Sequence, residues 1–296
     1  MSEVQGLSQL RRILAATDFS PLGDAAIHRA ALLAARAGSE LLILHAMPAW
    51  SVLDGAFGAS GDLPARMRGV AEARLAELIK RATQAGAQKA RGKIVEGAAL
   101  RVVLDEAANF HPDLLAIGAH GQGMLQQFFL GGTVSRLLAD AASPVLVVRR
   151  AVQGDYGATL VAVDLGPRSS TVLRAAITVA AQSRLTTVHA YQAPFEAKLR
   201  YKGFSEDDIV RYSAPEALTA QGSVDALFAN PEFVGLEMKM RIVHGHPNQV
   251  LFDAATALGV DLIAVGKHGG SRLGEKMMGS ITRLLAYYAP CDVLVV

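Results

Sequence analysis

Two glycine-framed segments of this sequence have the residue types and the spacing to bind an anion. One begins at Gly118 with GAHGQGMLQQFFLGGT, and the other begins at Gly266 with GKHGGSRLGEKMMGS. Glycine lets a backbone approach a ligand closely, and the free N–H groups of a helix start, expected at Gly279 and Ser280, form an anion site. The pattern therefore predicts a phosphate-bearing ligand at each segment, held mainly by backbone donors.

The two segments are copies of one unit. A constant 148 positions separates the shared residues, which are Gly118, His120, Gly121 and Gly131 in the first copy and Gly266, His268, Gly269 and Gly279 in the second. The copies differ where Gly132 replaces the hydroxyl residue Ser280, with Thr133 one position later. A hydrogen bond to a charged group is worth about 1.5 to 3 kcal/mol, so we expect the first site to be weaker.

Alternating strands and helices must position these segments. Short apolar runs bounded by turn residues predict strands, and alanine-rich stretches with helical spacing lie between them. The predicted strands are 11–17, 40–46, 113–119 and 144–150 in the first half and 158–164, 185–191, 261–267 and 292–296 in the second. Such strands suit parallel sheets covered by helices on both faces, so we predict an α/β fold of two tandem doubly wound sheets. Ligands bind these sheets at the carboxyl ends of the strands, where strand order reverses.

The repeat also sets the domain organisation. We place one domain at residues 1–150 and the second at 155–296, joined by the short linker AVQGDYG. The offset between the copies changes between their second and third strands, so insertions fall there. In the second half the inserted region is residues 192–230, and its sequence predicts one or two added helices.

Composition limits the classes of partner. The chain has 296 residues, 51% hydrophobic and 19% charged, and its 29 Lys+Arg against 27 Asp+Glu give a net charge of +2. That balance does not favour nucleic acid or an anionic membrane as a partner. We read no signal peptide and no apolar run of about 18 residues that could span a bilayer, so we expect a soluble cytoplasmic protein. The single cysteine, Cys291, is expected to be a buried structural thiol, since one thiol allows neither an intrachain disulfide nor a thiolate metal cluster.

Three features recur in order in both halves. They are the spacing G-x2-G-x9-G-[ST], an Asp after the first strand, as in ATDFS, and the strand ILHA followed much later by SPVLVV. In these features the chain resembles the universal stress protein family in its tandem form. The resemblance implies five parallel strands in the order 3-2-1-4-5 in each half. For the ATP-binding branch of the family it implies an adenine nucleotide, ATP, ADP or AMP, with Mg²⁺ as a further candidate ligand.

The resemblance also implies roles for residues of the second half. Asp164 would lie near the base and ribose, and Ala190 would line the adenine pocket. The ribose and phosphates would be approached by Val265, Gly266, His268 and Gly269, and the phosphate tail would be held by Gly279, Ser280, Ile281 and Thr282. The corresponding, weaker site of the first half would comprise Asp18, Ala46, Gly118, His120, Gly121, Gly131, Gly132 and Thr133. Which of Lys267, Arg272 and Lys276 reach the ligand is left open.

Several of these residues have alternative roles. Asp18 and Asp164 are good helix N-cap residues. His45 and His189 lie inside apolar strands, which favours hydrogen-bonded core histidines over ligands. His244 and His246 form an H-x-H pair, which on one strand face is the start of a metal-site pattern, but no third ligand is evident. We therefore assign no metal ligand and no catalytic residue.

The leading functional hypothesis is a nucleotide-binding stress or signalling module that passes its bound state to partners. One alternative is a slow ATP hydrolase or adenylate-handling enzyme with His268 or Asp164 as base, and another is a scaffold whose first site has decayed. The last strands of the two halves, in SPVLVV and CDVLVV, are apolar and would leave exposed edges. We therefore predict that they pair within the chain as a pseudo-dimer, and we also expect a homodimer through other surfaces.

Overall fold

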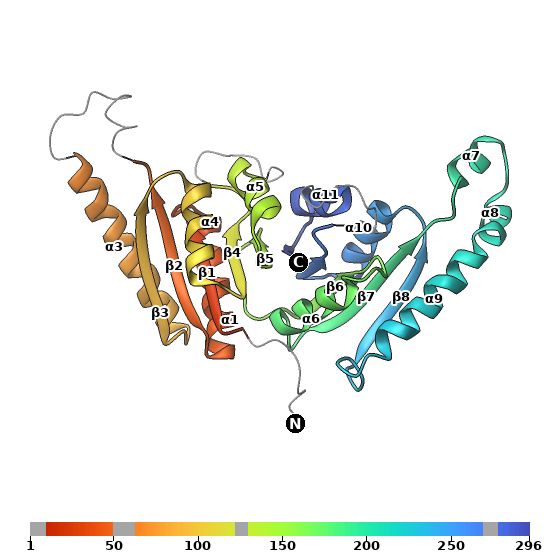
Figure 1. Cartoon of the computed structure of the whole chain (residues 1–296), viewed down its shortest axis with the longest axis horizontal. Coiled ribbons are helices and arrows are strands. Elements are labelled where there is room, and N and C mark those ends of the chain that lie inside the picture. Colours follow the sequence, from red (N-terminus) through yellow and green to blue (C-terminus); the bar gives the residue numbers. More distant parts are fainter. Residues whose placement is uncertain (1–9, 50–62, 122–129, 269–277) are drawn as a thin grey trace.

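The computed structural model describes residues 10–49, 63–121, 130–268 and 278–296 as alternating strands and helices (Figure 1). The first half contains β1 (Arg12–Thr17), α1 (Pro21–Ala37), β2 (Glu40–Met47), α3 (Leu63–Gln84), β3 (Lys89–Glu96), α4 (Ala99–Phe110), β4 (Leu114–Gly118), α5 (Gly132–Asp140) and β5 (Val145–Val148). The second half contains β6 (Ala158–Ala162), α6 (Ser169–Val179), β7 (Arg184–Tyr191), α7 (Glu196–Tyr201), α8 (Glu206–Tyr212), α9 (Ala214–Phe228), β8 (Met238–His244), α10 (Pro247–Leu258), β9 (Leu262–Val265), α11 (Ser280–Tyr288) and β10 (Asp292–Val295).

The strands form one ten-stranded sheet in the order β3-β2-β1-β4-β5-β10-β9-β6-β7-β8. Each half has the predicted parallel order 3-2-1-4-5, which confirms the fold class. The two predicted sheets are joined into one because β5 and β10 pair antiparallel. Figure 1 shows the halves side by side, with these two strands meeting at the centre of the molecule. We call this junction the seam.

Helices cover both faces of the sheet. Successive strand residues alternate between two core clusters; Ile13 of β1 belongs to one and Leu14 to the other. One cluster contains side chains of α1, α3, α6 and α9, and the other contains side chains of α4, α5, α10 and α11. No described helix is long and apolar enough to cross a membrane. The cytoplasmic location remains a prediction.

The seam combines apolar pairing with a buried polar anchor. Val293 lies opposite Val147, and both side chains are buried. Asp292, only 1% exposed, accepts hydrogen bonds from the Arg149 N–H at 2.9 Å and the Tyr156 hydroxyl at 2.8 Å, and it faces Arg29 at 3.6 Å. Burial raises the pKa of Asp292, which the neighbouring donors only partly offset. Residues of both halves and of the linker thus meet at one carboxylate.

Two other expectations concern the seam region. Cys291, next to β10, is buried, as predicted, and burial raises the pKa of its thiol to about 12. The domain limits 1–150 and 155–296 remain a prediction. The linker between β5 and β6 is held in place, because Tyr156 is buried and hydrogen-bonded.

The predicted insertion lies between β7 and β8 and contains three helices, α7, α8 and α9. The sequence predicted one or two added helices, and α9 occupies the place that α3 has in the first half. The two added helices are therefore α7 and α8. The apolar-run analysis did not locate β3 and β8, because these outer strands are only partly buried.

Lysine at both Val293 and Val295 is expected to open the seam. Burying an unpaired ammonium costs several kcal/mol, so the melting temperature should fall sharply and the scattering envelope should lengthen. Lysine at Val70 and Val234, which are 62% and 67% exposed, provides a control of equal charge. If the seam variant keeps the melting temperature and envelope of the control, the pairing is wrong.

Candidate functional site

The second half contains a cavity of about 320 Å³ at the carboxyl ends of β6, β7 and β9. The chain passes from β6 to β7 on one side and returns to β9 on the other side of β6, so strand order reverses at this point. Open parallel sheets bind ligands at such a switch point. The fold alone thus directs attention to this cavity, which we call the second cavity.

The residues predicted for the second site gather around the second cavity. Gly269 lies outside the described residues, as do Arg272 and Lys276. All the other predicted residues line the cavity, namely Asp164, Ala190, Val265, Gly266, His268, Gly279, Ser280, Ile281 and Thr282. Lys267 does not, since its ammonium donates to the Ala141 carbonyl in the first half at 3.0 Å.

Backbone hydrogen bonds hold the start of α11 at the cavity. The Gly279 N–H donates to the Lys267 carbonyl at 2.9 Å, and the first helical bond runs from the Arg283 N–H to the Gly279 carbonyl. The N–H groups of residues 280–282 therefore precede the helical ladder and have no backbone partner within the described residues. With the positive end of the helix dipole, these donors are suited to an anion.

Thr282 and Ser280 differ in what their hydroxyls can do. The Thr282 hydroxyl donates to the Gly266 carbonyl at 2.6 Å, and the residue is only 2% exposed. Its side chain therefore links α11 to the end of β9, and only its N–H remains for a ligand. Ser280 is exposed at the start of the helix and lines the cavity. Val134, the counterpart of Thr282 in the first half, has no hydroxyl for such a link.

Asp164 shapes the turn that follows β6. Its Oδ1 atom accepts hydrogen bonds from the Gly166 N–H at 2.9 Å and from the Ser169 hydroxyl at 3.1 Å. Asp18 likewise accepts from the Ser20 N–H at 3.0 Å. Neither is a helix N-cap, because α1 is capped by Ser20 and the N-cap position of α6 is Arg168. The N-cap alternative is therefore wrong for both residues.

The sequence analysis did not predict about half of the residues that line the second cavity. The Nδ1–H group of His189 donates to the Val163 carbonyl at 2.9 Å, as expected of a satisfied core histidine, but His189 also lines the cavity. His45 makes the same contact with Thr17. The unpredicted lining comprises Ala162, Val163, Arg168, Ser169, Val172, Val188, His189, Pro247 and Leu251. It is largely apolar, so one side of the cavity suits an apolar or aromatic group and the other an anion.

The first half has an equivalent cavity of about 250 Å³. All the predicted first-site residues line it, namely Asp18, Ala46, Gly118, His120, Gly121, Gly131, Gly132 and Thr133. In this first cavity, the glycine at the end of the strand has closer neighbours than its counterpart in the second cavity. A methyl group on Gly118 would lie 2.7 Å from the carbonyl carbon of Leu22 in α1, whereas on Gly266 its nearest neighbour would be 3.4 Å away. Helix α1 thus packs more closely against Gly118 than any described neighbour packs against Gly266.

Comparison with known proteins identifies the family. The family model described as "Universal stress protein family" matches residues 9–149 and again 156–296. The chain is a tandem universal stress protein.

Among curated relatives, universal stress protein A homolog 1 of Coxiella burnetii is 30% identical over 150 residues, covering 48% of this chain and 96% of that protein. Two solved structures share the whole fold. A functionally unknown protein of Pseudomonas aeruginosa matches with TM-score 0.66 and 17% identity, covering 97% of this chain and 92% of its own. A universal stress protein of Archaeoglobus fulgidus matches with TM-score 0.64 and 18% identity, covering 97% and 98%.

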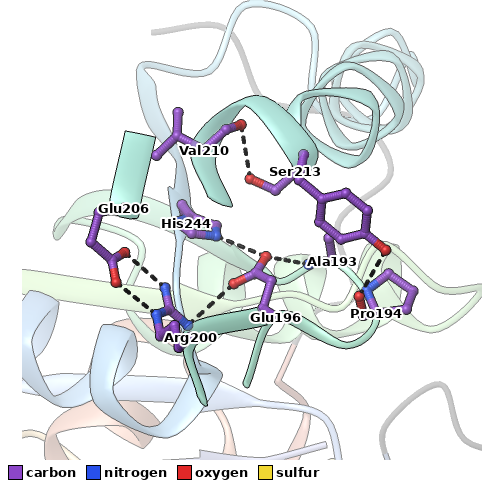
Figure 2. Close-up of polar contacts among 9 residues, drawn as sticks. Ala193, Pro194, Glu196, Arg200, Glu206, Val210, Ser213 and His244 are labelled. Atoms are coloured by element: carbon purple, nitrogen blue, oxygen red, sulfur yellow. Dashed lines mark hydrogen bonds and ion pairs between the residues drawn. The ribbon is translucent and has the colours of Figure 1, made fainter. Parts of the chain in front are cut away.

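In this universal stress protein, His244 at the end of β8 is bonded to Glu196 of α7, in the insertion between β7 and β8. Its Nε2 atom lies 2.9 Å from Oε1 of Glu196, which is 1% exposed and also accepts from the Ala193 N–H at 2.6 Å (Figure 2). Burial of Glu196 opposes its ionisation, but these donors outweigh burial and lower its pKa. Arg200 extends the network to Glu206 of α8 at 2.8 Å.

The neighbouring His246 acts separately. Its ring caps α10 by accepting from the Asn248 N–H at 3.3 Å. Within the described ranges no three His, Cys, Asp or Glu side chains are grouped so as to hold a metal ion. The H-x-H pair thus serves two different local structures, the insertion and a helix start.

The substitution Thr282→Val is expected to weaken the link between α11 and β9. The variant removes the hydroxyl that bonds the Gly266 carbonyl, and an unsatisfied buried group costs about 1 to 3 kcal/mol of unfolding free energy. Urea denaturation measures the change, and Thr282→Ser, which keeps the hydroxyl, should retain most of the stability. Equal stability of the valine variant and the wild type would show that the link contributes nothing.

Proposed function

We propose that this universal stress protein binds an adenine nucleotide in the second cavity and acts as a nucleotide-responsive module. The observation that carries the proposal is the pairing of two unlike surfaces in one cavity. Three N–H groups at the start of α11, which have no backbone partner within the described residues, share the cavity with apolar side chains of β6, β7 and α10. A nucleotide has the matching halves, an anionic phosphate tail and a flat apolar base.

The ligand orientation follows from these surfaces. The phosphates would lie at residues 279–282, where the backbone donors and the Ser280 hydroxyl are. The base would lie against Ala190, Val188 and Leu251, and the ribose between them near Asp164. A volume of about 320 Å³ is at the lower end of the roughly 300 to 1,000 Å³ typical of small-molecule sites. ATP, ADP and AMP share the chemistry that this cavity would recognise.

Mg²⁺ would accompany the phosphates when a di- or triphosphate is bound. Magnesium sites of this kind use one or two carboxylates together with the ligand's own phosphate oxygens. Asp164 is a carboxylate in the described lining, and its Oδ2 atom is not used by the turn contacts of Oδ1. The cavity thus offers a ligand for a phosphate-bound ion.

We propose binding as the function, with the second cavity as the stronger site. The donors at the anion end are backbone N–H groups and one hydroxyl, which position a phosphate but do not activate water. The first cavity keeps a helix start at Gly131 but lacks the hydroxyl of Ser280 and has a smaller volume. ATP turnover well above that of the Ser280→Ala variant would instead favour a hydrolase.

Valine at Gly279 is expected to abolish the stronger binding event. Its branched side chain would stand at the N-cap of α11, beside the donors that hold the phosphates. Calorimetric titration of the full chain with ATP measures the loss, and valine at Gly131 is the matched control in the first half. If the Gly131 variant loses the tighter site while the Gly279 variant keeps it, the ranking of the two cavities is wrong.

A further inference from the structure

Two helices of the second half have one end at the second cavity and the other end at the first half. The amino ends of α11 and α6 contribute to the lining, through residues 279–282 and through Arg168 and Ser169. Side chains of the first half reach their carboxyl ends, Arg36 of α1 at α6 and Arg149 after β5 at α11. The helices lie on opposite faces of the sheet, since they belong to different core clusters. The cavity is therefore bordered on both faces by helices that the first half touches.

Arg149 holds the carboxyl end of α11. It follows β5 of the first half, and its guanidinium donates to the carbonyls of Ala286 at 2.5 Å, Ala289 at 2.7 Å and Tyr287 at 2.9 Å. The last carbonyls of a helix have no partner within it, and a cation placed there is stabilising. A planar guanidinium with several donors suits this cluster of acceptors better than an ammonium.

Arg36 does the same for α6. It lies in the last turn of α1, and its Nη2 atom donates to the carbonyls of Thr178 at 3.0 Å and Val179 at 2.7 Å. Its Nη1 atom also lies 3.7 Å from Asp155 in the linker. On each face of the sheet, therefore, a different arginine of the first half holds a helix of the second half: Arg149 holds α11, and Arg36 holds α6.

We propose that Arg36 and Arg149 are positioning residues for the second cavity, so that the first half supports nucleotide binding by the second. The inference rests on the proposed function. A helix of nine residues is about 14 Å long, so the direct field of the cation at the cavity is largely screened. The effect instead passes through the helix as a rigid body, whose amino end must be held in place to meet a phosphate.

Within the part of the chain that the structure describes, one side-chain hydrogen bond runs in the opposite direction, from the second half to a helix end of the first half. Lys267 of the second half donates to the Ala141 carbonyl, which lies at the end of α5. Its repeat counterpart in the first half is Ala119, which carries no cation. Among the contacts of the described residues, the second half therefore holds a site helix of the first half by one bond, whereas α11 alone receives three.

The test compares three single variants of the full chain, Arg149→Met, Arg36→Met and Arg150→Met. Arg150 also crosses the seam, but its partner is the side chain of Asp261 and not a helix end, so it is the matched control. Calorimetric titration with ATP should show affinity for the second cavity reduced roughly fivefold to tenfold in the first two variants. The control should bind as tightly as the wild type.

A purely structural role is distinguished by two further readouts. Amide hydrogen exchange at Gly279 and Arg283, whose N–H groups are hydrogen-bonded at the start of α11, should accelerate in Arg149→Met but not in the control. Arg149→Lys keeps a cation and should recover part of the affinity, and it replaces the methionine variant if that one fails to fold. Unchanged ATP affinity in both arginine variants, with only a lower melting temperature, would overturn the inference. Failure of the wild type to bind ATP would instead overturn the proposed function.

Discussion

The antiparallel pairing of β5 with β10 is the interaction on which the rest of the structure depends. A half built as 3-2-1-4-5 ends in a short apolar strand, and such a bare edge invites association with any other strand. Here each half covers the edge of the other, which joins two five-stranded units into one sheet with continuous cores on both faces. Asp292 fixes the alignment because it accepts from a backbone N–H and a tyrosine hydroxyl while fully buried.

The pairing of the two halves also allows the two copies of the unit to differ in ligand binding. The second cavity has a hydroxyl at its helix start, a Thr282 link to β9, and helices held from the other half. The first has Gly132 and Val134 at these places, and α1 packs close above Gly118. The repeat is therefore symmetric in topology and asymmetric in chemistry, and the first half is placed to support the second.

The sequence predicted the parts that depend on local patterns. Apolar runs located the inner strands, and the spacing of glycines around Gly118 and Gly266 identified residues that line the two cavities. The outer strands β3 and β8 were harder to locate, since their partly buried residues do not form continuous apolar runs. Side-chain contacts between segments far apart in the sequence could also not be predicted from it. Nothing near Arg149 in the sequence indicates that it meets the end of α11, and nothing near Thr282 indicates that its hydroxyl bonds Gly266.

We propose that one cavity of this tandem chain, the second, holds an adenine nucleotide. Native mass spectrometry of the purified full chain, followed by identification of the ligand released on denaturation, tests it most directly. We expect a mass increment of one ATP, ADP or AMP per chain, either retained from the cell or taken up on addition. A chain that carries no nucleotide and takes up none, or that fills two sites with equal affinity, would contradict it.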